Sequence, residues 1–150
     1  SSEQLTDPTS AQYKALAWLS EDDTDTNIDD TLAVTQRYVL AVFYYSMNGP
    51  SWVDGSEWLQ PSVNVCEWAR ITCLAGEITA IIALEPTNMD GMLPTELDAL
   101  PSLVTLTIEK NAVRGFVGPL NRISKYRKDL FAFTHFFHSQ KHVAFQPSWD

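Results

Sequence analysis

The longest apolar pattern in the chain lies at residues 31–47, TLAVTQRYVLAVFYYSM. Apolar residues recur there at helical spacing and fill nearly every position of the second half, which predicts a helix covered on more than one side. Asp29 or Asp30 begins this helix, because a carboxylate is favoured at the positive end of the helix dipole. The triplet Asn-Gly-Pro at residues 48–50 predicts its end, since proline cannot continue a helix.

Two segments further along the chain repeat one pattern. Residues 79–94, TAIIALEPTNMDGMLP, align with residues 103–119, LVTLTIEKNAVRGFVGP, at an offset of 24. In this alignment Ile82 matches Leu106, so both are expected to point from short strands into a core. Asn111 satisfies backbone groups where the chain turns, and a glycine then permits the bend. Each copy has the features of one leucine-rich repeat, a family whose period is roughly 20–29 residues.

The pattern is imperfect in its first copy and after its second. Thr87 occupies the asparagine position of the first copy and Asn88 follows one place later, so we expect a small bulge there. After Pro119 the next strand, DLFAFTHFF, lacks the asparagine and the glycine, which predicts a degenerate repeat or a terminal cap. Two repeats are fewer than the three or so that a solenoid needs, so the aromatic residues near the end either complete the core or dock on another protein.

A specific resemblance joins these segments. A helix that ends in Tyr-Tyr is followed by a loop containing Gly and Trp, and then by the C-x-W-x₃-T-C sequence of residues 66–73. Together with the two repeats, this arrangement resembles the N-terminal cap and opening repeats of plant-type leucine-rich repeat proteins, in the version common in diatoms and other algae. The resemblance covers about residues 37–119. It implies an α/β fold, in which a short right-handed solenoid of β-strands and helical or 3₁₀ turns follows a helical N-terminal cap.

The resemblance also implies a role for the only two cysteines. Cys66 and Cys73 would form a disulfide that closes the cap over the apolar edge of the first repeat, with Trp68 packed beneath it. Two alternatives are a reactive thiol and a zinc site, although two cysteines without nearby histidines make a poor zinc site. A disulfide predicts an oxidising compartment, which is either extracellular or an organelle lumen such as the thylakoid lumen.

These patterns divide the chain into four segments. They are an acidic N-terminal tail with a short helix capped by Ser10 (1–30), the N-terminal cap (31–76), the two repeats (77–119), and a degenerate repeat or aromatic, basic C-terminal cap (120–150). No uncharged run reaches the ~20 residues that a membrane-spanning helix requires, so we expect membrane contact only through a partner.

Charge narrows the classes of partner. The chain of 150 residues has a formal net charge of −9, which argues against general nucleic-acid binding because that requires a basic surface. The charge is uneven: residues 1–30 carry eight acids against one base, and residues 114–142 carry six bases against one acid. These ends are either solvated surfaces or surfaces that meet different partners.

Candidate chemistry is confined to the last segment. His135, His138 and His142 have helical spacing that would place them on one face, and imidazoles suit zinc, copper or iron. No glutamate accompanies them as a ligand or general base, so a metal site is only a remote alternative. The chain also lacks a nucleophile elbow, a phosphate-binding glycine loop and a dinucleotide fingerprint. We therefore expect neither an enzyme nor a bound cofactor.

The sequence predicts a non-catalytic leucine-rich repeat protein that mediates protein–protein interaction. By the resemblance, the binding surface consists of the variable strand positions Ala83, Glu85, Thr105, Thr107 and Glu109. The alternative is a small structural accessory subunit docked in a larger assembly, such as a membrane-bound or photosynthetic complex. A histidine-based metal binder remains the remote alternative.

Overall fold

A computed structural model describes residues 2–23, 26–116, 131–137 and 141–145. At 109–110, 112 and 114–116, and throughout 131–137 and 141–145, it describes the backbone alone. The α-helices of these ranges are α1 (Ser2–Thr6), α2 (Ala11–Glu21) and α3 (Thr31–Ser46). The 3₁₀ helices are η1 (Gly49–Ser51), η2 (Gly55–Glu57), η3 (Val65–Glu67) and η4 (Thr95–Ala99). The strands are β1 (Ile71–Leu74), β2 (Glu77–Ala83), β3 (Asp90–Leu93), β4 (Thr105–Phe116), β5 (Phe131–Phe137) and β6 (Lys141–Phe145).

The predicted start and end of α3 are confirmed. The carboxylate of Asp30 accepts a hydrogen bond from a backbone N–H of the first turn at 3.0 Å. Beyond the last turn, Asn48 adopts the left-handed conformation with φ 57°, and η1 begins at once with a proline in its first turn. Ser10 caps α2 as predicted, because its hydroxyl accepts a hydrogen bond from the N–H of Tyr13. None of the helices in the described ranges combines the length and the apolarity needed to cross a bilayer.

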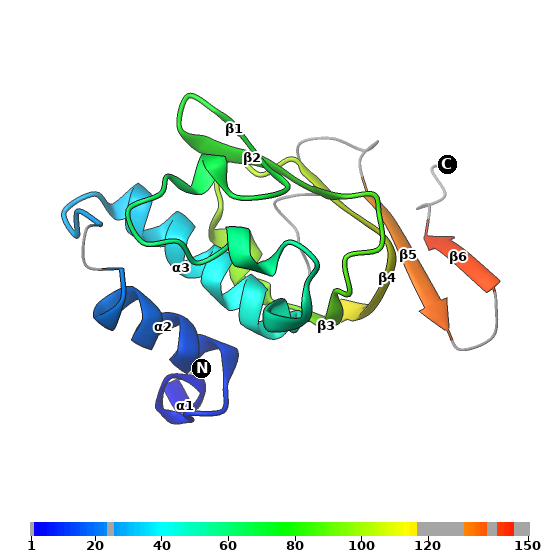
Figure 1. The fold of residues 1–150 in the computed structure, drawn as a ribbon, viewed down its shortest axis with the longest axis horizontal. Helices are drawn as coiled ribbons and strands as arrows, with labels where there is room; N and C mark the ends of the chain where they lie inside the picture. Colours follow the sequence, from blue (N-terminus) through cyan, green and yellow to red (C-terminus); the bar gives the residue numbers. More distant parts are fainter. Residues whose placement is uncertain (1, 24–25, 117–130, 138–140, 146–150) are drawn as a thin grey trace.

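The strands form an open sheet of mixed direction. Their order is β1–β2–β4–β5–β6, and β3 pairs with the second half of β4. The neighbours β2, β4 and β5 run parallel, whereas β1–β2 and β5–β6 are antiparallel pairs at the two ends of the strand order. In Figure 1 the helices gather toward one end of the molecule, and β5 and β6 lie at the other.

The predicted leucine-rich repeat solenoid is wrong. The described residues form three α-helices beside a small, open, mixed sheet, and no solenoid is evident in them. A solenoid requires a short strand followed by a turn in every repeat. Here β4 instead continues as one strand of 12 residues through Asn111, and the chain adds antiparallel neighbours at both ends of the strand order.

The prediction that the Asn111 side chain satisfies backbone groups is confirmed, but the chain does not turn at this residue, because β4 continues through it. Its side-chain oxygen accepts hydrogen bonds from the backbone N–H groups of Thr87 and Met89, at 2.9 and 3.0 Å, and from the Thr87 hydroxyl at 2.9 Å. Its amide nitrogen donates to the carbonyl oxygen of Glu85 at 3.3 Å. We call this set of four bonds the Asn111 bracket. It fastens the connection between β2 and β3 to β4.

The connection between β2 and β3 bulges by more than the single residue expected. Ala83 lies opposite Ile108, and Asp90 lies opposite Ala112. Asp90 follows Ala83 by seven positions, whereas Ala112 follows Ile108 by only four. The segment between β2 and β3 therefore contains three more residues than the part of β4 opposite it. The Asn111 bracket binds the buried N–H groups of Thr87 and Met89 in this bulge, which need a partner because they are shielded from water.

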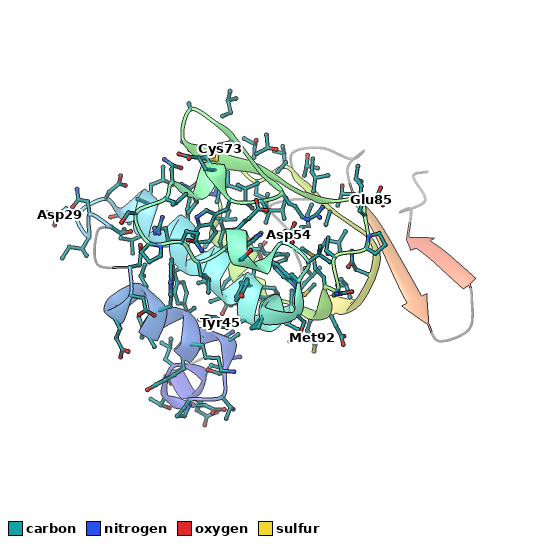
Figure 2. The ribbon with its side chains drawn as sticks, in the orientation of Figure 1. Asp29, Tyr45, Asp54, Cys73, Glu85 and Met92 are labelled. Atoms are coloured by element: carbon teal, nitrogen blue, oxygen red, sulfur yellow. A yellow bond between two sulfur atoms is a disulfide. The ribbon has the colours of Figure 1, made fainter. Side chains whose placement is uncertain are left out.

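The helices and the sheet enclose one aromatic core beside the confirmed disulfide. Cys66 and Cys73 are bonded, with their Cα atoms 5.6 Å apart, and join η3 to β1 (Figure 2, where Cys73 is labelled). Trp68, between the two cysteines, is buried as predicted and packs edge-on against Trp18 of α2, with ring centroids 5.9 Å apart. Trp58 lies on its other side at 5.6 Å, which extends the cluster toward α3.

We predict that Gly91→Ala destabilises the fold more than Gly76→Ala does. A Cβ on Gly91 would lie 2.0 Å from the carbonyl oxygen of Ser46, where β3 approaches the end of α3. Gly91 also has φ 152°, so we expect a loss of about 2–3 kcal/mol in the free energy of unfolding. Gly76 has φ 80° but no atom within 4 Å of an added Cβ, so its substitution costs about 1 kcal/mol of backbone strain. Urea denaturation measures both, and equal losses would contradict the close approach.

We predict that removal of the disulfide lowers stability without abolishing the fold. The two cysteines are separated by 7 positions in the sequence. For a loop of this length, the chain-entropy model predicts that the disulfide adds about 2.5 kcal/mol to the free energy of unfolding. Cys66→Ser/Cys73→Ser should therefore melt at a lower temperature than the wild type, by circular dichroism. Dithiothreitol should shift the wild type by a similar amount and leave the double variant unchanged. A wild type that melts at one temperature with and without reductant would show that the bridge contributes no stability.

Candidate functional site

One face of the sheet points away from the core. In the pairing of β2 with β4, Ile81 lies opposite Leu106 and Ala83 opposite Ile108, and all four side chains are fully buried. Because side chains alternate along a strand, the intervening residues point to the other side. This surface, called the outward face below, consists of Ile82, Thr105 and Thr107 together with the exposed Leu84, which follows the last residue of β2.

Along β2, the residues that point outward are shifted by one position from the predicted ones. A uniform offset of 24 places Ile82 and Leu84 in the core, but Ile82 is half-buried and Leu84 is 49% exposed. Ala83, predicted to contact a partner, has no exposed surface, so that prediction is corrected. A shift of one residue exchanges the two faces of a strand. On the outward face, the large apolar side chains of Ile82 and Leu84 therefore take the place of the small side chain of Ala83.

The other predicted binding residues have different placements. Thr105 and Thr107 are half-buried in β4, and Thr107 lies directly opposite Ile82. Glu85 is exposed and follows Leu84, and its carbonyl belongs to the Asn111 bracket (Figure 2). Glu109 lies in β4, but its side chain is outside the described set. The structure therefore brings the two threonines together with Ile82 and Leu84.

Sequence reasoning missed a rim beside the outward face, formed by Val53, Asp54 and Arg70. The Val53 side chain is 72% exposed, and its N–H donates to the carbonyl of Thr87 at 3.2 Å. The Asp54 carboxylate accepts a hydrogen bond from Arg70, whose carbonyl in turn accepts one from the N–H of Ile82 at 3.0 Å. These bonds hold the loop that follows η1 against β2. No local sequence signal indicates them, because the partners are far apart along the chain.

The part of the molecule that carries this surface is strongly acidic. Residues 1–116 contain 17 acidic and five basic residues, a formal net charge of −12. Two of the five bases, Arg37 and Arg70, are in ion pairs with aspartates. Glu57, in η2 just after the rim, is exposed, as is Glu85. The described charged side chains near the outward face are therefore mostly acidic, whereas the side chains of the basic residues within 110–141 are outside the described residues.

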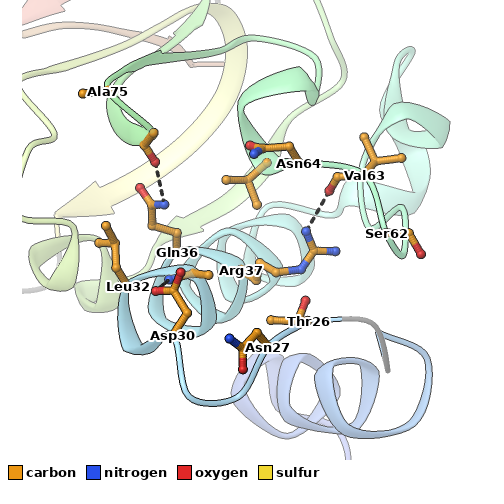
Figure 3. Close-up of a pocket in the computed structure, with 13 residues that line it drawn as sticks. Thr26, Asn27, Asp30, Leu32, Gln36, Arg37, Ser62, Val63, Asn64 and Ala75 are labelled. Carbon is orange, nitrogen blue, oxygen red and sulfur yellow. Dashed lines mark hydrogen bonds between the residues drawn. The ribbon is translucent and has the colours of Figure 1, made fainter.

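A separate pocket of about 460 Å³ lies at the start of α3. Its walls come from the α2–α3 connection, the first turns of α3, residues 62–65 and the turn between β1 and β2 (Figure 3). The Gln36 amide nitrogen donates to the carbonyl of Gly76 at 3.1 Å, and its oxygen accepts from the N–H of Ile78 at 2.7 Å. Gln36 therefore ties α3 to the β1–β2 turn, which is a structural role.

Arg37 is the other buried polar residue of this pocket, and it is held from several sides. Its guanidinium makes a two-point ion pair with Asp23, donates to the carbonyl of Val63 at 2.7 Å, and donates to that of Gln60 at 3.0 Å. It also lies over the rings of Trp18 and Trp68, 5.3 and 5.4 Å from their centroids. These contacts neutralise the charge of Arg37 within the protein, so we assign the residue a structural role.

The titratable groups with shifted pKa values lie elsewhere. Burial raises the pKa of Tyr44, Tyr38 and Tyr45 in α3, and for Tyr38 the nearby Glu96 carboxylate adds a smaller increase. The N–H of Thr9 donates to Asp7 at 2.8 Å and lowers the pKa of that exposed carboxyl. None of these groups belongs to the outward face or lines the pocket.

The predicted histidine alternative falls largely outside the described residues. His135 lies in β5 opposite Val143, and His142 lies in β6 opposite Phe136, so these two occupy strands instead of the expected helix face. Their side chains and all of His138 are outside the described set. Within the described residues, no three histidine, cysteine, aspartate or glutamate side chains come together as metal ligands.

No model of a protein family matches the chain, and no curated protein matches it.

We predict that Arg37→Lys costs more stability than Arg70→Lys. A lysine at position 37 keeps the charge but cannot reproduce the two-point pair together with both carbonyl contacts, so we expect a loss of about 2–3 kcal/mol. Arg70 makes a single, partly exposed ion pair, and its replacement should cost about 1 kcal/mol or less. Guanidinium denaturation compares the two variants. Equal effects would show that the buried guanidinium has no special structural role.

Proposed function

We propose that the protein is a non-catalytic binding module that docks another protein through its outward face. The observation that carries this proposal is the exposure of Leu84 and Val53 beside Ile82 and Thr107, on a surface fixed by strand pairing and by the rim. Apolar side chains on a rigid surface give a partner area to bury, and threonines supply hydrogen bonds at little entropic cost.

The size of the outward face sets a limit on this interaction. Two strands offer less than the roughly 800 Å² that each partner contributes to a standard interface. We therefore expect the rim and its neighbours to contribute to the contact as well. The disulfide supports an oxidising compartment for this protein, either extracellular or within an organelle lumen.

We predict that Leu84→Glu abolishes binding of the partner and that Leu16→Glu does not. Leu84 and Leu16 have similar exposed fractions, 49% and 45%, but Leu16 lies on α2, away from the outward face. A buried charge at the centre of an interface should weaken binding at least tenfold, whereas both variants should keep the wild-type melting temperature within about 2 °C. The test is affinity capture from an extract of the native cells, followed by direct binding of each purified candidate.

Three results would contradict the proposal. In the first, every protein captured by the wild type is also captured by Leu84→Glu. In the second, Leu16→Glu loses the same protein that Leu84→Glu loses. In the third, the purified candidate binds both variants with equal affinity. In each case the outward face would not be the docking surface.

A further inference from the structure

We propose that the pocket at the start of α3 binds one neutral hexose ring, either as a free sugar or at the end of a glycan. No residue of the outward face lines this pocket, so the inference goes beyond the proposed function and does not depend on it. Its basis is the pattern of hydrogen-bonding groups around the pocket, which combines several N–H donors with a single carboxylate acceptor.

Two buried side chains of the pocket each keep an N–H group that the described protein does not use. A guanidinium has five N–H groups. Four of those of Arg37 donate, two to the Asp23 carboxylate and two to backbone carbonyl groups. Gln36 donates one N–H of its side-chain amide to the carbonyl of Gly76. No described residue accepts from the remaining N–H of either side chain, so a ligand oxygen in the pocket would give both donors a partner.

Two asparagines add donors from different walls of the pocket. Asn27 lies in the α2–α3 connection, and Asn64 lies just before η3 (Figure 3). The side-chain oxygen of Asn27 accepts from the N–H of Asp29 at 3.0 Å. The side-chain oxygen of Asn64 accepts from the N–H of Cys66 at 2.9 Å. These bonds orient both amides, and no described residue accepts from their Nδ2 atoms, which are therefore available to a ligand.

The carboxylate of Asp30 is the acceptor of the pocket and determines which charge a ligand can carry. One of its oxygens accepts from the N–H of Ala33 at 3.0 Å, and the exposed second oxygen can accept from a ligand hydroxyl. Among the described residues that line the pocket, the other charged one is Arg37, which is paired with Asp23. The charge of Asp30 therefore disfavours an anion. The N–H donors disfavour an ammonium group, because it can only donate.

A neutral sugar matches these groups. Each hydroxyl both donates and accepts, so one can donate to Asp30 while others accept from the N–H groups. The volume of about 460 Å³ lies within the range of roughly 300–1,000 Å³ that is typical of small-molecule sites. Leu32 and Val63 are half-buried in the lining and supply apolar surface for the C–H groups of a ring. An apolar ligand would leave the buried donors without acceptors.

The same side chains hold the walls of the pocket in place. Gln36 ties α3 to the β1–β2 turn, and Arg37 ties it to residues 60–63. The disulfide at Cys66 fastens the segment that carries Asn64. A preformed site loses less conformational entropy on binding, so it can hold a ligand of few atoms. For a single ring we expect a dissociation constant of about 1–10 mM.

The test is a titration of the full oxidised chain with glucose, galactose and mannose, followed by NMR of the backbone and side-chain amides. Each hexose is added as the free sugar and as its methyl glycoside, with the matching uronates and cyclohexanol for comparison. We expect at least one hexose to bind saturably, with the largest shifts at Gln36, Asn27 and Asn64. Its uronate should bind at least threefold more weakly, and cyclohexanol, which has a single hydroxyl, should not bind. Equal binding of the glycoside indicates a glycan end, and weaker binding indicates a free sugar.

Substitutions that keep the structural hydrogen bonds isolate the ligand contacts. Asn64→Asp retains the oxygen that accepts from Cys66 and removes Nδ2, so the affinity should fall at least fivefold at an unchanged melting temperature. Asn27→Asp tests the other wall in the same way. The matched control is Asn48→Asp, at an exposed residue beyond the other end of α3, which should change the affinity less than twofold. Asp30→Asn keeps the oxygen that caps α3 and removes the charge, so the hexose and its uronate should bind more equally.

Four results would overturn the inference. In the first, no hexose binds saturably. In the second, the largest shifts lie outside the pocket. In the third, Asn64→Asp binds the sugar no more weakly than Asn48→Asp does. In the fourth, the uronate or cyclohexanol binds as tightly as the hexose. None of these results bears on the outward face, which the capture experiment with Leu84→Glu tests separately.

Discussion

The Asn111 bracket is the constraint on which the outward face depends. A single buried amide receives three hydrogen bonds at its oxygen and donates one from its nitrogen, all to the bulge between β2 and β3. Because the N–H groups of Thr87 and Met89 are buried, a position of the bulge that lost these bonds would leave them without partners, at a cost of about 1–3 kcal/mol each. The bracket thereby fixes where β2 lies against β4. Since strand register decides which side chains point outward, it also fixes Ala83 inside and Ile82 outside.

A second set of contacts holds the helices against this sheet. Arg37 links α3 to the α2–α3 connection through Asp23 and to the loop of Gln60 and Val63, while Trp68 packs beside it. Removal of one partner from such a pair would leave an uncompensated buried charge, so the pair enforces one arrangement even where its net contribution to stability is modest. The disulfide fastens the same region to β1. The edge of the sheet, including the rim, is therefore built on a rigid support.

Local features of the fold were predictable from the sequence, and the pairing of its strands was not. The caps at Ser10 and Asp30 and the end of α3 each depend on a few neighbouring residues with one physical reason, whereas the disulfide followed from the resemblance and the role of Asn111 from the repeated pattern. The register was not predicted because residues 80–84, AIIAL, are all apolar. The alternation of apolar and polar residues therefore cannot show whether Ile81 or Ile82 points into the core. The solenoid prediction failed because local strand and turn signals do not determine whether a strand such as β4 continues or bends.

The most direct test of this account is the solvent exposure of individual methyl groups in the unmodified protein. A soluble paramagnetic agent broadens the NMR signals of methyl groups in proportion to their accessibility. We expect strong broadening for Leu84 and Val53, intermediate broadening for Ile82, and protection of Ile81, Leu106 and Ile108. Protection of Leu84 together with broadening of Ile81 would contradict the register that the Asn111 bracket imposes, and the outward face would not exist in the form described.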